Sequence, residues 1–174
     1  MRRIAVAALF VAVVAAGAAL AFRTDRDEPA GEGVVSHVRD GDTIELTNGD
    51  VVRLVQIDTP ELSDGECYAK RARALLERLL PLGTRVRIAE DPALDRVDRY
   101  GRRLAYVFRG GVNVNRVLVA RGAAGVWFFE GSRGRYARAL LAAESRAKAE
   151  RLGLWRRCPG TRLDPLEPIS SGTA

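Results

Sequence analysis

Three short strand-like runs, placed close together, most constrain what this chain can fold into. The β-prone runs Val34–Val38, Thr43–Leu46 and Val51–Ile57 follow one another with only short polar connections between them. The second connection contains Asn48-Gly49, a dipeptide that favours a tight hairpin turn. Connections this short join antiparallel neighbours, because a parallel pair needs a longer crossover. The sequence therefore predicts an antiparallel three-stranded meander.

The rest of the chain adds two strands and three helices to this meander. Apolar residues at helical spacing, and β-prone runs bounded by polar residues, glycine or proline, mark them in the sequence. In chain order they are a helix over Cys67–Leu80, strands over Arg85–Glu90 and Leu104–Phe108, and helices over Val114–Arg121 and Tyr136–Leu152. This order favours an α+β, mainly β fold, a five-stranded OB-type Greek-key barrel with three packed helices. A mixed α+β sandwich is the alternative.

The N-terminal residues have the pattern of an export signal. Arg2 and Arg3 precede the apolar run Ile4–Phe22, and Ala19-Leu20-Ala21 is a candidate cleavage site. The same run is long enough to span a bilayer if it is not removed, and membrane contact is expected only through residues 4–22. Residues 1–22 are therefore predicted to be a signal peptide or a membrane anchor. The domain is expected to be secreted or, alternatively, anchored to the cell membrane and facing outward.

One domain is expected after this segment. The chain has 174 residues, and its 47% hydrophobic content is enough for one buried core. Residues 23–33 are charged and contain proline and glycine, which indicates a linker. The domain is predicted over residues 34–158. Residues 159–174, rich in proline, serine and glycine, are predicted to be a disordered tail.

Export makes the two cysteines a candidate disulfide. Cys67 and Cys158 are the only cysteines, and disulfides persist in oxidising compartments. Two free or buried thiols are the alternative. His37, the only histidine, lies in the first predicted strand and is interpreted as structural. A zinc cluster is disfavoured by so few nitrogen and sulfur ligands.

The charge balance favours a polyanionic partner only modestly. The chain carries 28 basic and 22 acidic residues, for a formal net charge of +6. Such an excess attracts nucleic acid, but a solvated surface of mixed charge explains it equally well.

Acidic residues at the ends of the meander strands have the chemistry of a cation site. Asp42 and Asp58 lie at the edges of adjacent runs, so both can reach one end of a barrel. Neighbouring carboxylates repel unless a cation joins them, and oxygen ligands in an exported protein favour Ca²⁺. Arg53 and Asp58 are five residues apart, which places them on opposite faces of a regular strand. A site that uses both requires a bulge or turn near Gln56.

Two arginines have the chemistry for a phosphate ligand. Arg53 lies in the third predicted strand, and Arg102 lies on the loop before the fifth. The guanidinium group donates paired hydrogen bonds to phosphate oxygens and stays charged, which a lysine does not match. An ordinary surface charge is the alternative for each.

Three motifs in order resemble the staphylococcal nuclease (thermonuclease) family. They are DGDT at Asp40–Thr43, R-x₄-DTPE at Arg53–Glu61 and DRYGR-x-LAYV at Asp98–Val107. The late LGLW, Leu152–Trp155, also resembles the family, and the match spans about Val34 to Trp155. The OB barrel of that family agrees with the strand count above.

The resemblance implies a role for each motif residue. The implied metal site is Ca²⁺ held by the carboxylates of Asp42 and Asp58 and the main-chain carbonyl of Thr59. The resemblance further implies three catalytic residues, one contact to the substrate phosphate and one supporting acid. In that order these are Arg53, Glu61 and Arg102, then Tyr100, then Asp40.

The implied reaction is Ca²⁺-dependent hydrolysis of phosphodiester bonds in DNA and/or RNA, with single strands preferred and 3′-phosphate products. A monomer is expected. One alternative is a catalytically weak nucleic-acid-binding OB module at the cell envelope, and another is a membrane-tethered protein with a structural role. Two segments depart from the family pattern. The loop Leu62–Glu66 is short, and Trp127-Phe128-Phe129 lacks the tyrosines that stack on bases, so core packing is favoured over stacking there.

Overall fold

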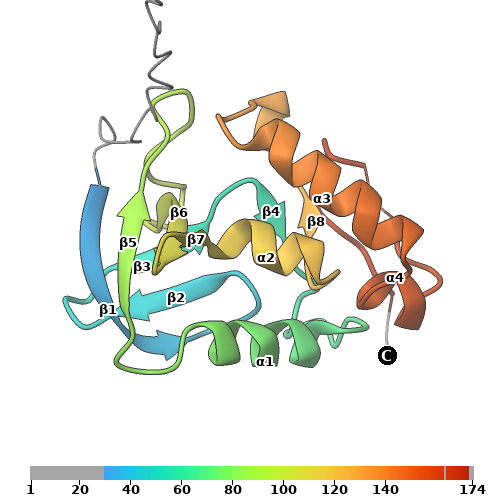
Figure 1. Cartoon of the computed structure of the whole chain (residues 1–174), viewed down its shortest axis with the longest axis horizontal. Coiled ribbons are helices and arrows are strands. Elements are labelled where there is room, and N and C mark those ends of the chain that lie inside the picture. Colours follow the sequence, from blue (N-terminus) through green and yellow to red (C-terminus); the bar gives the residue numbers. More distant parts are fainter. Residues whose placement is uncertain (1–29, 163, 173–174) are drawn as a thin grey trace, which may run out of the picture.

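Five strands close into a barrel in the computed structural model, which describes residues 30–162 and 164–172. The sheet runs in the order β3-β2-β1-β5-β6, and β3 also pairs with β6 in parallel, which closes it (Figure 1). The strands are β1 (Ala30–Val38), β2 (Thr43–Leu46), β3 (Val51–Leu54), β5 (Arg85–Ala89) and β6 (Arg103–Arg109). The predicted α+β barrel of five strands is confirmed.

Three helices and several short elements surround the barrel. The helices are α1 (Ala69–Leu79), α2 (Val114–Ala120) and α3 (Ala137–Ala149), followed by the short α4 (Leu154–Arg157). The short elements are β4 (Ile57–Asp58), β7 (Val112–Asn113), β8 (Gly125–Val126) and the 3₁₀ turn η1 (Phe129–Gly131). β4 and β8 pair with each other outside the barrel. Within residues 30–162 and 164–172, no helix is long and apolar enough to cross a membrane. The predicted signal peptide or anchor lies outside the described residues.

The first strand begins at Ala30, within the predicted linker rather than at Val34. Its first half pairs with β5 and its second half with β2. Glycine made this stretch look like a linker, yet Gly33 is required for packing, since a Cβ there would lie 2.6 Å from a methyl carbon of Leu46. The backbone pairing with β5 needs no apolar side chains, so hydrophobic patterning did not mark it.

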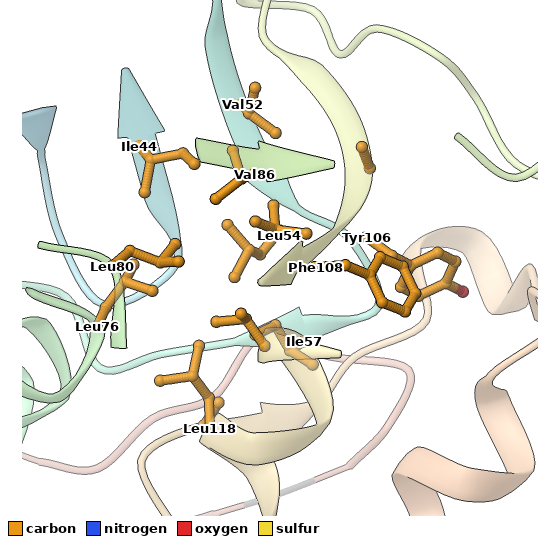
Figure 2. Packing of buried hydrophobic residues seen from close by; sticks show 14 of the residues in the cluster. Ile44, Val52, Leu54, Ile57, Leu76, Leu80, Val86, Tyr106, Phe108 and Leu118 are labelled. Carbon is orange, nitrogen blue, oxygen red and sulfur yellow. The ribbon is translucent and has the colours of Figure 1, made fainter. Parts of the chain in front are cut away.

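Apolar side chains from the barrel and the helices meet in one core. Leu54 and Ile57 lie near its centre, and Leu76 of α1 and Leu118 of α2 approach from the helices (Figure 2). The side of α1 that carries Ala72 and Leu76 is fully buried, as its helical spacing predicted. α1 therefore covers the barrel with one face and leaves its opposite, basic face outward.

A disulfide between Cys67 and Cys158 joins the start of α1 to the end of α4, which confirms the predicted pair. The Cα atoms are 5.9 Å apart, although 91 residues separate the cysteines in sequence. In the chain-entropy model, closing a loop of this length raises the free energy of the unfolded chain by about 4.6 kcal/mol.

The C-terminal segment, residues 164–172, packs against the domain, which differs from the predicted disordered tail. Ile169 is only 6% exposed and packs near Cys158 and Leu154. Main-chain bonds hold it at both ends, from Phe128 N to the Pro165 carbonyl at 2.6 Å and from Cys67 N to the Gly172 carbonyl at 2.7 Å. Composition predicted disorder because a single buried isoleucine and main-chain hydrogen bonds leave little trace in it.

Candidate active site

Asp42, Arg53 and Asp58 form a buried charge cluster at one end of the barrel. The Nε of Arg53 lies 3.0 Å from Asp42 Oδ1, and its Nη2 lies 2.6 Å from Asp58 Oδ1. The Nη1 of Arg53 donates to the carbonyls of Leu54 and Ile57, at 2.7 and 2.8 Å. The structure therefore brings together three of the residues that sequence motifs singled out.

The predicted interruption near Gln56 makes this meeting possible. Gln56 has a φ of 64°, and it separates β3 from β4, which the sequence predicted as one strand. Its side chain is anchored, since Gln56 Nε2 donates to the Ser132 carbonyl and its Oε1 accepts from Gly134 N. The turn shifts the side-chain alternation, so Arg53 and Asp58 meet despite their odd spacing.

Thr59 fixes the orientation of Asp42. Both the N–H and the hydroxyl of Thr59 donate to Asp42 Oδ2, each at 2.9 Å. Gly41 allows this approach, because a Cβ there would lie 2.7 Å from Thr59 Oγ1 and 2.9 Å from the Cβ of Ala72. Asp40 supports the same turn by accepting a hydrogen bond from Asp42 N at 3.0 Å. The DGDT motif is thus a tight turn packed on α1.

The C-terminal segment completes the setting of Asp58. Ile169 N donates to Asp58 Oδ2 at 2.9 Å, across 111 residues of sequence. Sequence analysis missed this contact, because a main-chain donor carries no residue signature. An isolated isoleucine in a proline- and serine-rich tail was the only available signal.

Burial of the two carboxylates outweighs the stabilisation that Arg53 gives to their charged forms. Burial raises the pKa of Asp42 to about 8, although Arg53 opposes the rise. Burial likewise raises the pKa of Asp58 above its ordinary value, again against the effect of Arg53. Burial alone would lower the pKa of Arg53, but the two aspartates raise it above its usual range. One guanidinium therefore does not compensate two buried carboxylates.

The donor chemistry at the cluster fits a hard cation. Asp42 and Asp58 supply carboxylate oxygens, and no described donor bonds to the main-chain carbonyl of Thr59. Residues 30–162 and 164–172 hold no group of three or more His, Cys, Asp or Glu side chains at metal-binding distance. A cation here would therefore rely on two carboxylates, a carbonyl and water, an oxygen set that suits Ca²⁺ or Mg²⁺.

Glu61 lies exposed at the edge of the cluster. Its main-chain N–H donates to Glu66 Oε2 at 2.8 Å, which holds the turn after Pro60. Partial burial, followed by the negative charges of Asp58 and Asp40, raises the pKa of Glu61. Among the described residues no side chain pairs with its carboxylate. The group is therefore accessible and has a raised affinity for a proton, as a general base requires.

Arg102 does not contact the cluster. Its Nε lies 2.7 Å from Asp98 Oδ2, and its N–H donates to Asp98 Oδ1 at 3.0 Å. Its guanidinium carbon lies 5.3 Å from the centre of the Tyr100 ring. Tyr100 is 67% exposed, and its hydroxyl accepts from Arg99 at 2.6 Å. The structure thus places Arg102 and Tyr100 together on one surface loop, with every bond shown here made inside that loop.

The aromatic segment divides between core and surface. Phe128 is fully buried, as core packing predicted, whereas Phe129 is 57% exposed. Trp127 packs edge-on against Phe129 with ring centres 5.8 Å apart, and its ring centre lies 6.0 Å from the guanidinium carbon of Arg53. Trp127 therefore covers the charge cluster, while Phe129 faces solvent.

Comparison with known proteins agrees with the motifs. The family model described as "Staphylococcal nuclease homologue" matches residues 51–157. The SPbeta prophage-derived endonuclease YokF of Bacillus subtilis is 35% identical over 127 residues, covering 67% of this chain and 41% of the relative. Endonuclease YncB of the same organism is 33% identical over 127 residues, covering 67% and 57%. The thermonuclease of Staphylococcus intermedius is 31% identical over 144 residues, covering 78% and 83%.

The chain spans about half the length of the two Bacillus subtilis relatives, and most of the staphylococcal one. The matched region holds β3 to α4, and with them the cluster residues Arg53 and Asp58, the edge residue Glu61 and the loop residue Arg102. On this extent of similarity, together with the barrel, the chain belongs to the staphylococcal nuclease homologue family.

Proposed function

We propose that this chain is an exported, Ca²⁺-dependent nuclease that hydrolyses phosphodiester bonds of DNA and/or RNA, with single strands preferred. The observation that supports it most is the buried charge cluster, where one guanidinium does not offset the burial of two carboxylates. Beside it lies Glu61, which is accessible and whose carboxylate pairs with no described side chain. Binding of nucleic acid alone does not require such buried carboxylates, whereas strongly shifted pKa values are typical of catalytic and metal sites.

The carboxylates of Asp42 and Asp58 and the carbonyl of Thr59 would hold the ion. When bound, Ca²⁺ supplies positive charge that stabilises developing charge on the phosphate oxygens. Glu61 would accept the proton of the attacking water at its carboxylate. The water oxygen then bonds to phosphorus as the bond to the 5′-oxygen breaks, which leaves a 3′-phosphate and a 5′-hydroxyl protonated from solvent.

The two arginines would contribute differently to phosphate binding. A guanidinium has five N–H donors, and the described contacts of Arg53 use four of them. One N–H of Arg53 therefore remains for a phosphate oxygen. The guanidinium of Arg102 donates to Asp98 only through its Nε. Both of its Nη groups therefore remain to bind two phosphate oxygens. Arg102 is thus the principal phosphate clamp, and Arg53 chiefly holds the carboxylates in place.

Export is part of the proposal and rests on residues 1–22, with the disulfide as support. Disulfides are stable in oxidising compartments and rare in reducing ones. Fractionation of the source cells tests it, with the processed or anchored chain expected in the medium or envelope. Recovery of the chain in the cytosol with free thiols would contradict export.

The test of the activity is digestion of denatured DNA and of RNA by the full chain, with Ca²⁺ added back after chelation. Cleavage is expected only with the ion, and the products are expected to carry 3′-phosphate ends. Glu61→Gln serves as the matched inactive control, because it keeps the shape of the side chain without the base. Undiminished cleavage in chelator would overturn the metal assignment. Binding without cleavage under every condition would instead favour the nucleic-acid-binding module.

A further inference from the structure

A second concave surface lies on the outward side of α1, apart from the charge cluster. It is a groove of about 520 Å³ that four cationic side chains line, Lys70, Arg71, Arg78 and Arg121. Tyr68, Ala74 and Leu75 line it as well. No acidic residue lines this groove, although the chain as a whole has 22 acids for 28 bases.

The four cations of the groove have no acidic partners among the described residues. All four side chains are exposed, and none takes part in an ion pair shown by the structure. Glu77, the one acid of α1, pairs instead with Arg73 at 3.0 Å, away from the groove. The positive field in the groove is therefore uncompensated, and such concave surfaces concentrate polyanions.

The spacing of the cations suits a linear anion. Lys70, Arg71 and Arg78 of α1 all line the groove, and at about 100° per residue they fall within an arc of about 100° around the helix. Lys70 and Arg78 are separated by about 12 Å along the helix axis, so the row of cations is longer than one nucleotide. Arg121, which follows α2, adds a cation from a second helix. Cations from two helices thus flank a partly apolar floor.

α1 connects this groove to the active site. Its inner face meets the Asp40–Thr43 turn, as shown by the 2.9 Å between a Cβ at Gly41 and the Cβ of Ala72. Tyr68, at the first end of the groove, follows Glu61 after only the short loop Leu62–Glu66 and Cys67. The loop and the start of α1 thus connect Glu61 to the groove along the chain.

We propose that this groove binds the phosphate backbone of a single-stranded nucleic acid, beyond the nucleotides that are cleaved. The choice of ligand rests on the proposed function. A lipid surface carries similar phosphates, but a flat bilayer matches a groove between two helices less well than a linear chain does. The side chains on its floor, Leu75 and Tyr68, offer apolar contacts to sugars and bases.

The test compares two variants with equal loss of charge. The groove variant is K70Q/R71Q/R78Q/R121Q, and the control is R85Q/R116Q/R138Q/R146Q, whose exposed side chains lie outside the groove. Binding of a long fluorescent single strand to the full chain is measured by anisotropy in chelator, where no cleavage is expected. Cleavage of the long strand and of a small chromogenic phosphodiester is then measured with Ca²⁺, and thermal unfolding confirms that both variants fold.

The groove variant is expected to bind the long strand at least about tenfold more weakly than the control. The slope of log K against log salt is expected to fall by about 3, at about 0.7 per lost contact. KM for the long strand should rise, whereas kcat/KM for the small substrate should stay unchanged.

Equal weakening in both variants would overturn the groove and leave only general charge attraction. If the groove variant lost binding to anionic vesicles but still bound the single strand normally, the groove would be a lipid-binding surface and the proposal would be wrong. Normal cleavage by the parent chain combined with no effect of the groove variant refutes the groove alone. A parent chain that neither binds nor cleaves nucleic acid refutes the proposed function as well.

Discussion

The buried charge cluster and the loop Asp98–Arg102 hold their arginines in opposite ways. Arg53 is enclosed by Asp42, Asp58 and two carbonyls, with almost all of its donors used. Arg102 has one carboxylate partner, Asp98, on an exposed loop. The same side-chain chemistry is therefore a fixed structural support in one region and an available ligand in the other.

This difference separates stability from substrate binding. A buried guanidinium between carboxylates is costly to disturb, because removing it leaves uncompensated charge away from water. The Arg102–Asp98 pair, whose side chains are 27% and 16% exposed, contributes less to folding than the fully buried cluster, since water and salt still screen it in part. Arg102 can therefore exchange Asp98 for a phosphate at small cost, whereas Arg53 cannot leave its partners.

Replacement of Arg53 is the strongest test of the comparison. Arg53→Met should lower the free energy of unfolding by about 3–5 kcal/mol, because Asp42 and Asp58 stay buried without their cation. Activity should be lost as well. Urea unfolding at neutral pH measures the first effect. Arg53→Lys, which keeps the charge, should lose less stability, and a cost of Arg53→Met below about 1 kcal/mol would show that the cluster does not support the fold.

Arg102→Ala should separate activity from stability. Turnover should fall by about 100- to 1,000-fold, as expected when a donor to the transition state is removed. The free energy of unfolding should change by about 1 kcal/mol, less than for Arg53→Met, since the ion pair is only partly buried. Steady-state kinetics and urea unfolding measure both quantities. Arg99→Ala on the same loop is the matched control, and an equal loss of turnover there would assign the effect to the loop instead of to Arg102.

Removal of the C-terminal segment probes how the cluster is held. A chain that ends before Asp164 loses the N–H that Ile169 donates to Asp58. Ca²⁺ affinity should fall by about 10- to 100-fold, the usual effect of losing a group that orients a metal ligand. Calorimetry measures it directly. Ile169→Ala keeps the N–H and should retain most of the affinity, and similar losses in both variants would point to packing instead.

In metal-free protein, the pKa values of one aspartate in each region should be shifted in opposite directions. Burial raises the pKa of Asp42 to about 8, whereas hydrogen bonds from Arg102 and Tyr100 outweigh partial burial and lower the pKa of Asp98. The raised pKa of Asp42 means that the folded state binds the extra proton. This contribution to stability is therefore present at acid pH and falls as the pH rises from 3.8 towards about 8.

The contribution of Asp98 has the opposite sign. It is fully present above its ordinary pKa of 3.8 and is lost as the pH falls through its lower folded pKa. Carboxyl carbon resonances followed by NMR across pH would resolve both groups. A measured pKa of Asp42 lower than that of Asp98 would contradict the difference in environment between the two regions.

Local patterns predicted those parts of the molecule that depend on neighbours in sequence. The meander, the interruption at Gln56 and the cysteine pair all followed from turn chemistry, strand periodicity and the export signal. Patterning missed the first residues of β1, because Ala30, Gly31, Glu32 and Gly33 pair with β5 without forming an apolar run. It also missed the C-terminal segment, whose contacts are carried by backbone groups.

The same limit applies to the candidate site. The motifs identified the charged residues, but not how Arg53 distributes its donors, because two of its four contacts are to main-chain carbonyls. Nor did they show that Arg102 pairs with Asp98 and stays apart from the cluster. Residue type predicts which chemistry is available, while the closed barrel decides which donors remain free for a ligand.

The hydrogen bond from the Ile169 N–H to Asp58 also means that the cluster forms late during synthesis of the chain. A ribosome makes Asp58 first and must add 111 more residues before its partner exists. At about 5–20 residues per second, that interval lasts roughly 6–20 s. In every nascent chain that ends before Ile169, Asp58 lacks the hydrogen bond from the Ile169 N–H. The cluster is therefore completed only after residue 169 has been made, so a shorter nascent chain does not present a fully formed site.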